Sequence, residues 1–149
     1  MLEAIRLSTE NVDRGGGPFG AVIVKDGKII AKAANSVTLT NDPTAHAEVN
    51  AIRLAAKELG TFDLSGCEIY TSCEPCPMCL GAIYWARLDK VYYANTKNDA
   101  RDIDFDDAFI YDEIQRPMTE RHTPFIPLMR EEALAAFKKW QDKEDKIEY

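Results

Sequence analysis

The chain has 149 residues, of which 46% are hydrophobic and 29% charged, and its formal net charge is -7. This length and apolar content suffice for one domain with its own core, and no apolar run is long enough to span a membrane. Phosphate contacts dominate affinity for nucleic acids, so the acidic balance and the lack of a dense Lys/Arg cluster favour a small, neutral substrate. The start, Met1-Leu2-Glu3-Ala4, lacks the basic and apolar regions of an export signal, and a cytoplasmic location is therefore expected.

The first part of the chain predicts a helix and then a β-hairpin. An amphipathic helix is predicted from residues that recur at spacings of three and four, namely Leu2, Ile5, Thr9 and Val12. Two apolar, β-prone stretches follow at residues 19–25 and 28–34. The pair Asp26-Gly27 between them is a strong signal for a hairpin turn.

A glycine run separates the helix from the hairpin and resembles a phosphate-binding motif. The spacing Gly15-x-Gly17-x-x-Gly20 matches dinucleotide-binding loops. That motif requires a strand before the glycines and a helix after them, whereas here a helix precedes and a strand follows. We therefore expect the glycines to end the helix and to shape the rim of a pocket.

The middle of the chain alternates helices and strands after a polar loop at residues 35–41. A helix that carries His46 is predicted from the spacing of Val49, Ile52, Ala56 and Leu59, and Gly60 ends it. Residues 67–72 predict a short buried strand, residues 76–87 a helix and residues 90–95 another strand. In the helix at residues 76–87, the side chains expected to face the core are Leu80, Ile83 and Tyr84. A strand, a helix and a strand with short joints predict a parallel crossover, so the fold class is α/β with helices that start at ligand-binding strand ends.

The last third turns acidic and then irregular. Asp102, Asp104 and Asp106, with Glu113 at the twelfth place, imitate a calcium loop. That loop demands glycine at its sixth place, where Asp107 stands, so a helix start is the simpler interpretation of these acids. Prolines 117, 124 and 127 mark an irregular segment, with a brief edge strand expected at residues 125–129. A last helix is predicted at residues 131–143, with Leu134, Phe137 and Trp140 on its apolar side. No internal repeat or domain boundary is evident, so residues 1–149 are expected to form a single domain.

Two half-motifs carry the chemistry of the chain. His46-Ala47-Glu48 followed by Pro75-Cys76-Pro77-Met78-Cys79 reads H-x-E and P-C-x-x-C, the pattern of zinc-dependent base deaminases. A catalytic zinc takes three protein ligands of N or S type and leaves one position for water. His46, Cys76 and Cys79 supply these three ligands. Glu48 is not needed as a ligand and is predicted to be the general acid/base that moves the proton of the water.

The helical context supports a catalytic site. Cys76 and Cys79 share one face of a helix start, and Pro77 suits the first helical position. Asp42 or Thr44 is expected to cap the helix of His46. Two helix N-termini would then point at one metal and stabilise thiolate charge.

The cysteines fit a structural zinc site or an iron–sulfur site less well than a catalytic zinc site. A closed structural zinc site normally shows two CxxC-like halves, and here the second half is His-x-Glu. The spacing Cys73-x-x-Cys76-x-x-Cys79 resembles an iron–sulfur run, but position 83 is Ile instead of a fourth cysteine. Cys67 and Cys73 are expected to be inert buried thiols.

With these residues placed, the chain resembles the bacterial guanine deaminases of the cytidine-deaminase fold over nearly its whole length. The stretches around His46 and Cys76 are shared with tRNA adenosine deaminases and other members. The specific resemblance lies in residues 16–22, residues 105–111 and the terminal Glu148-Tyr149. It implies a three-layer α/β/α domain around a five-stranded mixed sheet, with one zinc ion per subunit on His46, Cys76 and Cys79.

The resemblance also implies further site residues and a dimer. Substrate contacts come from Asn35, from Phe19 by stacking, from Ala47 and from Trp85, which would line the pocket. Asp107 is implied as a second catalytic carboxylate that recognises or protonates the leaving amine. Homodimers exchange their C-terminal segment, about residues 117–149 here, so that Tyr149 reaches the partner's substrate.

Each of these residues also has a simpler interpretation. Asn35 can be a turn residue, and Phe19 and Trp85 can be core aromatics. Asp107 can be the acid of a helix start, and Tyr149 can be part of a frayed chain end.

We expect zinc-dependent hydrolytic deamination of guanine to xanthine and ammonia, in purine catabolism or salvage. The alternatives are deamination of a nucleoside such as guanosine or cytidine, and tRNA adenosine editing, which the net charge disfavours. A zinc-stabilised binding module without catalysis is a further alternative, against which the intact Glu48 and the open coordination position argue. No nucleic acid or membrane partner is expected.

Overall fold

The computed structural model describes residues 1–105 and 107–149 of the chain. They divide into two compact units, Met1–Ala108 and Phe109–Tyr149, which are described separately below. Asp106, one of the acids expected to precede a helix, lies outside the described residues.

The first unit alternates helices and strands in the order predicted from the sequence. Its elements are α1 (Leu2–Asp13), β1 (Gly20–Lys25), β2 (Lys28–Ala34), α2 (Val37–Thr40), α3 (Ala47–Leu59), β3 (Cys67–Cys73), α4 (Pro77–Trp85), β4 (Lys90–Asn95) and α5 (Lys97–Arg101). The two short helices α2 and α5 were not predicted. The first of them replaces part of the expected polar loop, because Val37–Thr40 forms a single helical turn between Ser36 and a left-handed Asn41.

The strands form one mixed sheet in the order β2-β1-β3-β4. Strand β1 is antiparallel to both β2 and β3, whereas β3 and β4 are parallel, as the crossover through α4 requires. Asp26 (φ 50) and Gly27 (φ 75) both have left-handed backbones, which is the geometry of a tight hairpin turn. The predicted α/β class, hairpin and crossover are therefore confirmed.

The expected fifth strand is absent from the part of the chain that the structure describes, where the sheet has four strands. Residues 125–129, the stretch expected to form a brief edge strand, have no regular secondary structure. Pro124 and Pro127 lack the N–H groups that a strand ladder needs, and Met129 has a left-handed backbone (φ 54). These three residues are sufficient to interrupt strand pairing.

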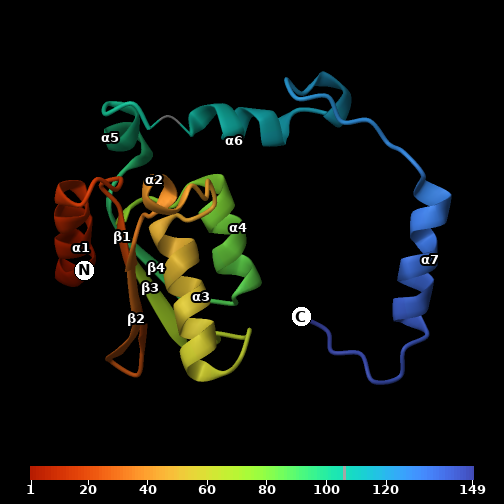
Figure 1. The fold of residues 1–149 in the computed structure, drawn as a ribbon, viewed down its shortest axis with the longest axis horizontal. Helices are drawn as coiled ribbons and strands as arrows, with labels where there is room; N and C mark the ends of the chain where they lie inside the picture. The colour runs from red at the N-terminus through yellow and green to blue at the C-terminus, as the bar shows by residue number, and fades with distance from the viewer. Residues whose placement is uncertain (106) are drawn as a thin grey trace. The chain divides into compact units, whose positions relative to one another are not determined.

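The sheet is the middle of three layers, with α1 on one face and α3 and α4 on the other (Figure 1). The core between them centres on Ile23, Leu64 and Ile69, all fully buried. Helix α3 contributes its alanines to this core, including Ala51 and Ala55. Small side chains let the helix lie close to the sheet, so the start of α3 is held firmly against β1 and β2.

Helix α1 is present, but it buries a different face from the one expected. Its buried residues are Ala4, Ser8 and Asn11, whereas Leu2 is 84% exposed. The reason is a close approach between α1 and β1, because a Cβ added to Gly20 would lie 2.3 Å from the carbonyl oxygen of Ala4. At this separation only small or hydrogen-bonding side chains fit between helix and sheet.

Helix α4 also departs from its expected orientation. Ile83 is buried as predicted, but Leu80 and Tyr84 are exposed, and so is Trp85. Nearly every residue of α4 is apolar, so its composition cannot select one face by periodicity. The helix therefore leaves apolar side chains at the surface of this chain.

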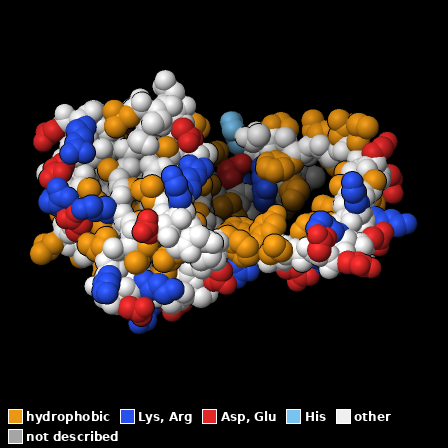
Figure 2. All heavy atoms as spheres, turned by 60° about the horizontal axis from the view of Figure 1, so that its bottom comes forward, with side chains coloured by type: hydrophobic (Ala, Val, Ile, Leu, Met, Phe, Trp, Pro, Cys, Tyr) orange, Lys and Arg blue, Asp and Glu red, His pale blue; other side chains and the backbone are white. Residues whose placement is uncertain are grey.

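The second unit contains α6 (Ala108–Gln115, which begins at the boundary residue), the short 3-10 helix η1 (Met118–Glu120) and α7 (Arg130–Gln141). The predicted last helix is thus confirmed, one residue early at its start. None of residues 109–149, all of them described, is buried. Hydrophobic side chains at the molecular surface are seen in Figure 2, and those of this unit include Phe137 and Trp140 on α7. The apolar side predicted for α7 is therefore exposed within this chain.

Every helix in the described part of the chain is too short or too polar to cross a lipid bilayer.

Candidate metal centre and active site

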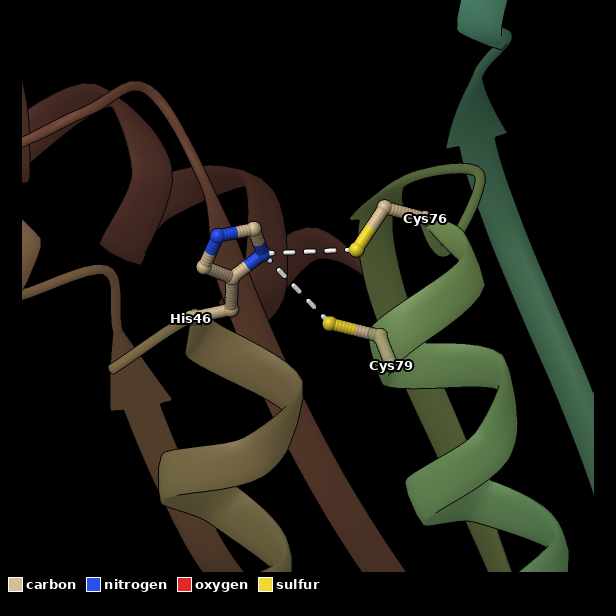
Figure 3. A group of neighbouring side chains, drawn as sticks. All are labelled: His46, Cys76 and Cys79. Carbon is tan, nitrogen blue, oxygen red and sulfur yellow. Dashed lines mark hydrogen bonds between the residues drawn. The ribbon is translucent and has the colours of Figure 1, made fainter. Parts of the chain in front are cut away.

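The two half-motifs meet at the N-termini of α3 and α4. His46 is the N-cap residue of α3, Cys76 is the N-cap residue of α4, and Pro77 occupies the first turn of α4 as predicted. The backbones of both caps are extended, which turns the chain sharply into each helix. The side chains of His46, Cys76 and Cys79 consequently point toward one another (Figure 3).

The expected cap of α3 by Asp42 or Thr44 is wrong. Asp42 Oδ1 accepts hydrogen bonds from the backbone N–H (2.8 Å) and the hydroxyl (2.7 Å) of Thr44, so the pair closes its own turn before the helix. The N-terminus of α3 has no side-chain cap. Its N–H groups therefore remain directed at the metal centre.

The three side chains fit a tetrahedral zinc ion. Their ligand atoms all lie within 4.8 Å of one another, and His46 Nδ1 lies 3.5 Å from each of the two sulfur atoms. Zn–S bonds of about 2.3 Å and Zn–N bonds of about 2.0 Å at a tetrahedral angle separate N from S by about 3.5 Å. Among the described residues this is the one group of metal-ligand side chains so arranged. The protein binds zinc at this site.

Hydrogen bonds among the three ligand side chains shift their pKa values. The Cys79 thiol and the His46 ring stabilise the Cys76 thiolate by hydrogen bonds and lower the pKa of Cys76 to about 4. The same thiolate, together with burial, raises the pKa of Cys79. The hydrogen bond to Cys76 raises the pKa of His46. A divalent cation at this site is bound by both sulfurs as thiolates.

Glu48 lies in the first turn of α3 beside the ligands. It is 5% exposed, and desolvation by burial raises the pKa of its carboxyl group. The Thr71 hydroxyl lies 3.0 Å from Oε1, and the Cys79 thiol donates to Oε2 at 3.4 Å. A carboxyl group with a raised pKa, held at a metal centre, has the properties needed to accept a proton and to return it.

Thr71 was not predicted as a site residue. It lies on β3, is fully buried, and its hydroxyl is also 3.0 Å from the carbonyl oxygen of Cys73. In β3 the buried residues alternate through Cys67, Ile69 and Thr71, so the period of two along this strand would have placed Thr71 on the side of the core. What it contacts there depends on how α3 packs on the sheet.

Asn35 and Phe19 lie together at the mouth of the β1–β2 hairpin. The Asn35 N–H donates to the carbonyl oxygen of Phe19 (3.0 Å), and Asn35 Oδ1 accepts from the N–H of Val37 (3.1 Å). The Phe19 ring meets the ring of Phe105 edge-on at 4.9 Å. Asn35 is therefore both a turn residue and a buried polar group, and its contact with a substrate stays a prediction.

The structure brings some of the other candidates to the metal centre. Ala47 is fully buried between His46 and Glu48 in the chain. Asp107 is half-buried, and its charge contributes to the raised pKa of His46. Its role as a second catalytic carboxylate stays a prediction.

Two candidates are not brought to the centre by the first unit. Trp85 is the last residue of α4 and is 66% exposed. It lies roughly 13 Å along the helix axis from Cys76, given the rise of a helix per residue. Tyr149 ends the second unit. The substrate contacts expected of both residues stay predictions.

Cys67 and Cys73 are buried free thiols, as expected. The Cys73 thiol donates to the carbonyl oxygen of Thr96 at 3.5 Å, and burial raises the pKa of Cys73 to about 11. A thiol so hard to ionise is a poor metal ligand and a poor nucleophile. Of the four cysteines, Cys76 and Cys79 are therefore the two that are suited to bind the metal.

Comparison with known proteins gives the same assignment. The family described as "Cytidine and deoxycytidylate deaminase zinc-binding region" matches residues 1–95. Guanine deaminase of Bacillus subtilis is 57% identical over 150 residues, covering 100% of this chain and 96% of that protein. The X-ray structure of guanine deaminase from Bacillus subtilis matches 99% of this chain and 95% of that chain with a TM-score of 0.96 at 56% identity.

More distant relatives match a smaller part of the chain. The tRNA-specific adenosine deaminase of Aquifex aeolicus is 47% identical over 91 residues, which is 61% of this chain and 60% of that protein. A structure in complex with 2,6-diaminopurine matches with a TM-score of 0.68 at 37% identity, covering 70% of this chain and 59% of that chain. Metal-ligand geometry, fold and similarity agree, and the chain belongs to the zinc-dependent cytidine and deoxycytidylate deaminase family, in the branch that includes the guanine deaminase of Bacillus subtilis.

Proposed function

We propose that this protein is a zinc-dependent hydrolase that converts guanine and water to xanthine and ammonia. The observation that carries the proposal is the buried Glu48 carboxyl group beside a tetrahedral His46–Cys76–Cys79 ligand set, in a chain 57% identical over its whole length to a guanine deaminase. The acidic net charge and the small size are consistent with a small, uncharged substrate.

Zinc, when bound by His46, Cys76 and Cys79, lowers the pKa of water at its open coordination position toward neutrality. Glu48 takes a proton from the attacking water and delivers it to N3 of the base. A C–O bond forms at C2, and the bond between C2 and the amino nitrogen then breaks. The remaining proton of the water, now on the C2 hydroxyl, passes to this nitrogen through the Glu48 or the Asp107 carboxylate, so that ammonia leaves and C2 keeps a carbonyl oxygen.

The proposed base contacts come from Asn35, Phe19, Ala47 and Asp107. Guanine carries an N–H at position 1 beside its 2-amino group, and an ionised carboxylate such as Asp107 can accept from both donors. Asn35 offers a carboxamide, and Phe19 an aromatic face for stacking. A site built from such hydrogen bonds discriminates strongly, because a wrong base would leave buried polar groups unpaired.

The proposed assembly is a homodimer that exchanges its C-terminal segments, about residues 117–149. Residues 109–149 include no buried residue, although α7 carries large apolar side chains such as Phe137 and Trp140. The first unit exposes apolar side chains of its own on α4 and β4, including Trp85 and Tyr93. Packing of one copy's segment on a second copy would bury both surfaces and bring Tyr149 to the partner's site.

A cytoplasmic location is part of the proposal. All four cysteines are free thiols, and two of them must stay reduced to bind zinc. The reducing conditions of the cytoplasm preserve such thiols.

The test is ammonia release from guanine, guanosine, cytidine, adenine and a tRNA anticodon stem carrying adenosine. The zinc-loaded protein is assayed first, then after chelation, then after zinc is restored. Guanine alone is expected to be deaminated, and the activity should disappear and return with the metal. Turnover of guanosine in preference to guanine would replace the proposed substrate, and full activity of metal-free protein would overturn the mechanism.

A further inference from the structure

Asn11 lies in the last turn of α1, and its side chain connects two parts of the candidate base pocket. It is 4% exposed although it is polar. Its Nδ2 donates to the carbonyl oxygen of Gly17 at 2.8 Å and to the carbonyl oxygen of Asn35 at 2.7 Å. Both N–H groups of the carboxamide are therefore used, and both acceptors are backbone atoms far from α1 in the sequence or beyond its end.

The backbone of Asn11 contributes a third bond to the same region. Its carbonyl oxygen accepts from the N–H of Gly16 at 2.9 Å, which holds the glycine turn that follows the helix. Asn11 thus ties residues 16 and 17 to residue 35 through three hydrogen bonds.

Asn35 is consequently held from several directions. Its carbonyl oxygen accepts from Asn11, its N–H donates to Phe19, and its Oδ1 accepts from the N–H of Val37. Within the described part of the chain, no hydrogen-bond partner is found for Asn35 Nδ2. The first two bonds hold the backbone of residue 35, and the third holds its side-chain oxygen, which leaves the amino group available to a ligand.

The glycine run is explained by the same arrangement. A Cβ added to Gly16 would lie 2.2 Å from Asn11 Nδ2, and one added to Gly17 would lie 3.3 Å from Asn35 Cγ. The two glycines therefore make room for two carboxamides. This accounts for the resemblance to a phosphate-binding loop without any phosphate.

We infer that Asn11 is a positioning residue that orients Asn35 toward the base. The inference rests on the proposed function in one respect, namely that Asn35 contacts the substrate. Asparagine is suited to this role because only a neutral carboxamide offers two N–H donors at this length. Aspartate would place a negative charge against two carbonyl oxygens. Alanine would remove both bonds, and the Gly17 carbonyl oxygen would keep only its bond from the Phe19 N–H (2.8 Å).

The kinetic test is Asn11→Ala in the zinc-loaded protein. The KM for guanine should rise by roughly 5- to 20-fold, since one buried hydrogen-bonding group is lost, while kcat stays within about twofold. The zinc ligands and Glu48 belong to α3 and α4, which Asn11 does not touch through any of these bonds. A fall in kcat with an unchanged KM would overturn the inference.

A double-mutant cycle shows whether Asn11 acts through Asn35. In an Asn35→Ala background, Asn11→Ala should change KM by less than about twofold, because the residue that it positions is already gone. Multiplicative effects of the two substitutions would show that Asn11 acts by another route. Gly16→Ala supplies a second variant, since its added Cβ displaces the Asn11 carboxamide without removing it, and the same increase in KM is expected.

Hydrogen exchange supplies a readout that does not depend on activity. In the substrate-free, zinc-loaded Asn11→Ala protein, the amides of Gly16, Asn35 and Val37 should exchange faster, and the Val37 amide reports directly on the Asn35 side chain. Ser8→Ala is the matched control, because it removes another buried polar group of α1, one whose hydroxyl donates locally, to the carbonyl oxygen of Ile5 (2.8 Å). Ser8→Ala should alter neither these amides nor KM.

The two readouts separate failure of this inference from failure of the proposed function. If wild-type protein does not deaminate guanine, the exchange result still decides whether Asn11 orders Asn35. If guanine is turned over but Asn11→Ala leaves exchange and KM unchanged, the positioning role is refuted and the proposed function stands.

Discussion

In residues 1–108 apolar side chains of the sheet, α3 and α4 are buried around Ile23, Leu64 and Ile69, whereas residues 109–149 carry two α-helices and a 3-10 helix without a single buried residue. The first unit binds its metal with residues of its own, and the ligand atoms are already spaced for zinc. The contacts of the second unit include the Phe109 and His122 rings at 5.9 Å and the His122 N–H bonded to Glu113 at 2.7 Å.

The two units therefore differ in whether their apolar side chains are buried within one chain. The core of the first unit is complete within one chain, so its stability should not depend on protein concentration. The helices of the second unit have the same kind of amphipathic pattern, but they contain no buried residue. Such a segment gains stability by packing against another surface, and the proposed exchange between two copies supplies one.

The first unit supplies all three zinc ligands, and Glu48 is not one of them. We therefore expect that Glu48 can be changed without loss of the metal. Glu48→Gln should lower kcat by about 10²–10⁴-fold, because the group that moves the proton is lost. Zinc content, measured by atomic emission, should remain near that of the wild type. Glu58→Gln, which changes an exposed carboxylate at the other end of α3, is the control and should be fully active. Undiminished turnover by Glu48→Gln would remove Glu48 from the mechanism.

A matched pair of isoleucines tests the difference in burial. Ile69 is 0% exposed in the first unit, and Ile126 is 81% exposed in the second. Ile69→Ala should lower the free energy of unfolding by roughly 2–5 kcal/mol, because a buried side chain leaves a cavity. At protein concentrations where the chain is monomeric, Ile126→Ala should change it by less than about 0.5 kcal/mol. Equal losses in denaturant unfolding would contradict the distinction between the units.

Association of two copies is tested on α7. Trp140→Asp should weaken dimerisation by at least about tenfold, since a large apolar side chain contributes roughly 1.5–3 kcal/mol when it is buried. Phe137→Asp should have a similar effect, whereas Lys138→Ala on the same helix should have little. Sedimentation equilibrium measures the dissociation constants. A monomeric wild-type protein, or unchanged association of both Asp variants, would exclude the exchange through α7.

The buried hydroxyl of Thr71 should contribute a smaller effect on catalysis. Thr71→Val keeps the shape of the side chain but removes its hydrogen bond to Glu48, and kcat should fall by roughly 3- to 10-fold. Thr71→Ser restores a hydroxyl and should recover most of this loss in steady-state assays. Equal defects in both variants would indicate a packing role for the Thr71 methyl group.

The smallest effect is expected at the surface contact of α1 with β2. Hydrogen bonds from Arg6 and then Lys32 lower the pKa of Glu3 to about 2 from a reference value of 4.5. Because the pKa is lower in the folded state, the stabilisation by Glu3 is present above pH 4.5 and is lost as the pH falls toward 2. Glu3→Gln should therefore be slightly less stable than wild type at pH 7 and equal to it near pH 2. A difference that grows on acidification, measured by thermal unfolding, would contradict this pKa.

Much of the fold was predictable because each element has a local cause. The Asp26-Gly27 turn, the parallel crossover and the helix starts at His46 and Cys76 follow from residue types a few positions apart. The buried face of α1 was predicted wrongly, because the close approach at Gly20 outweighs the apolar spacing of Leu2 and Val12. The fifth strand was predicted wrongly as well, because prolines interrupt the ladder of residues 125–129.

The metal centre was determined by the sequence itself. Zinc chemistry restricts which residue types can bind, and two short motifs at helix starts satisfy it whatever the rest of the chain does. The supporting contacts, from Thr71 to Glu48 and from Asn11 to Asn35, were decided only by the tertiary structure. These pairs are 23 and 24 residues apart. No local pattern encodes such contacts, because their distances depend on how closely α1 and α3 approach the sheet.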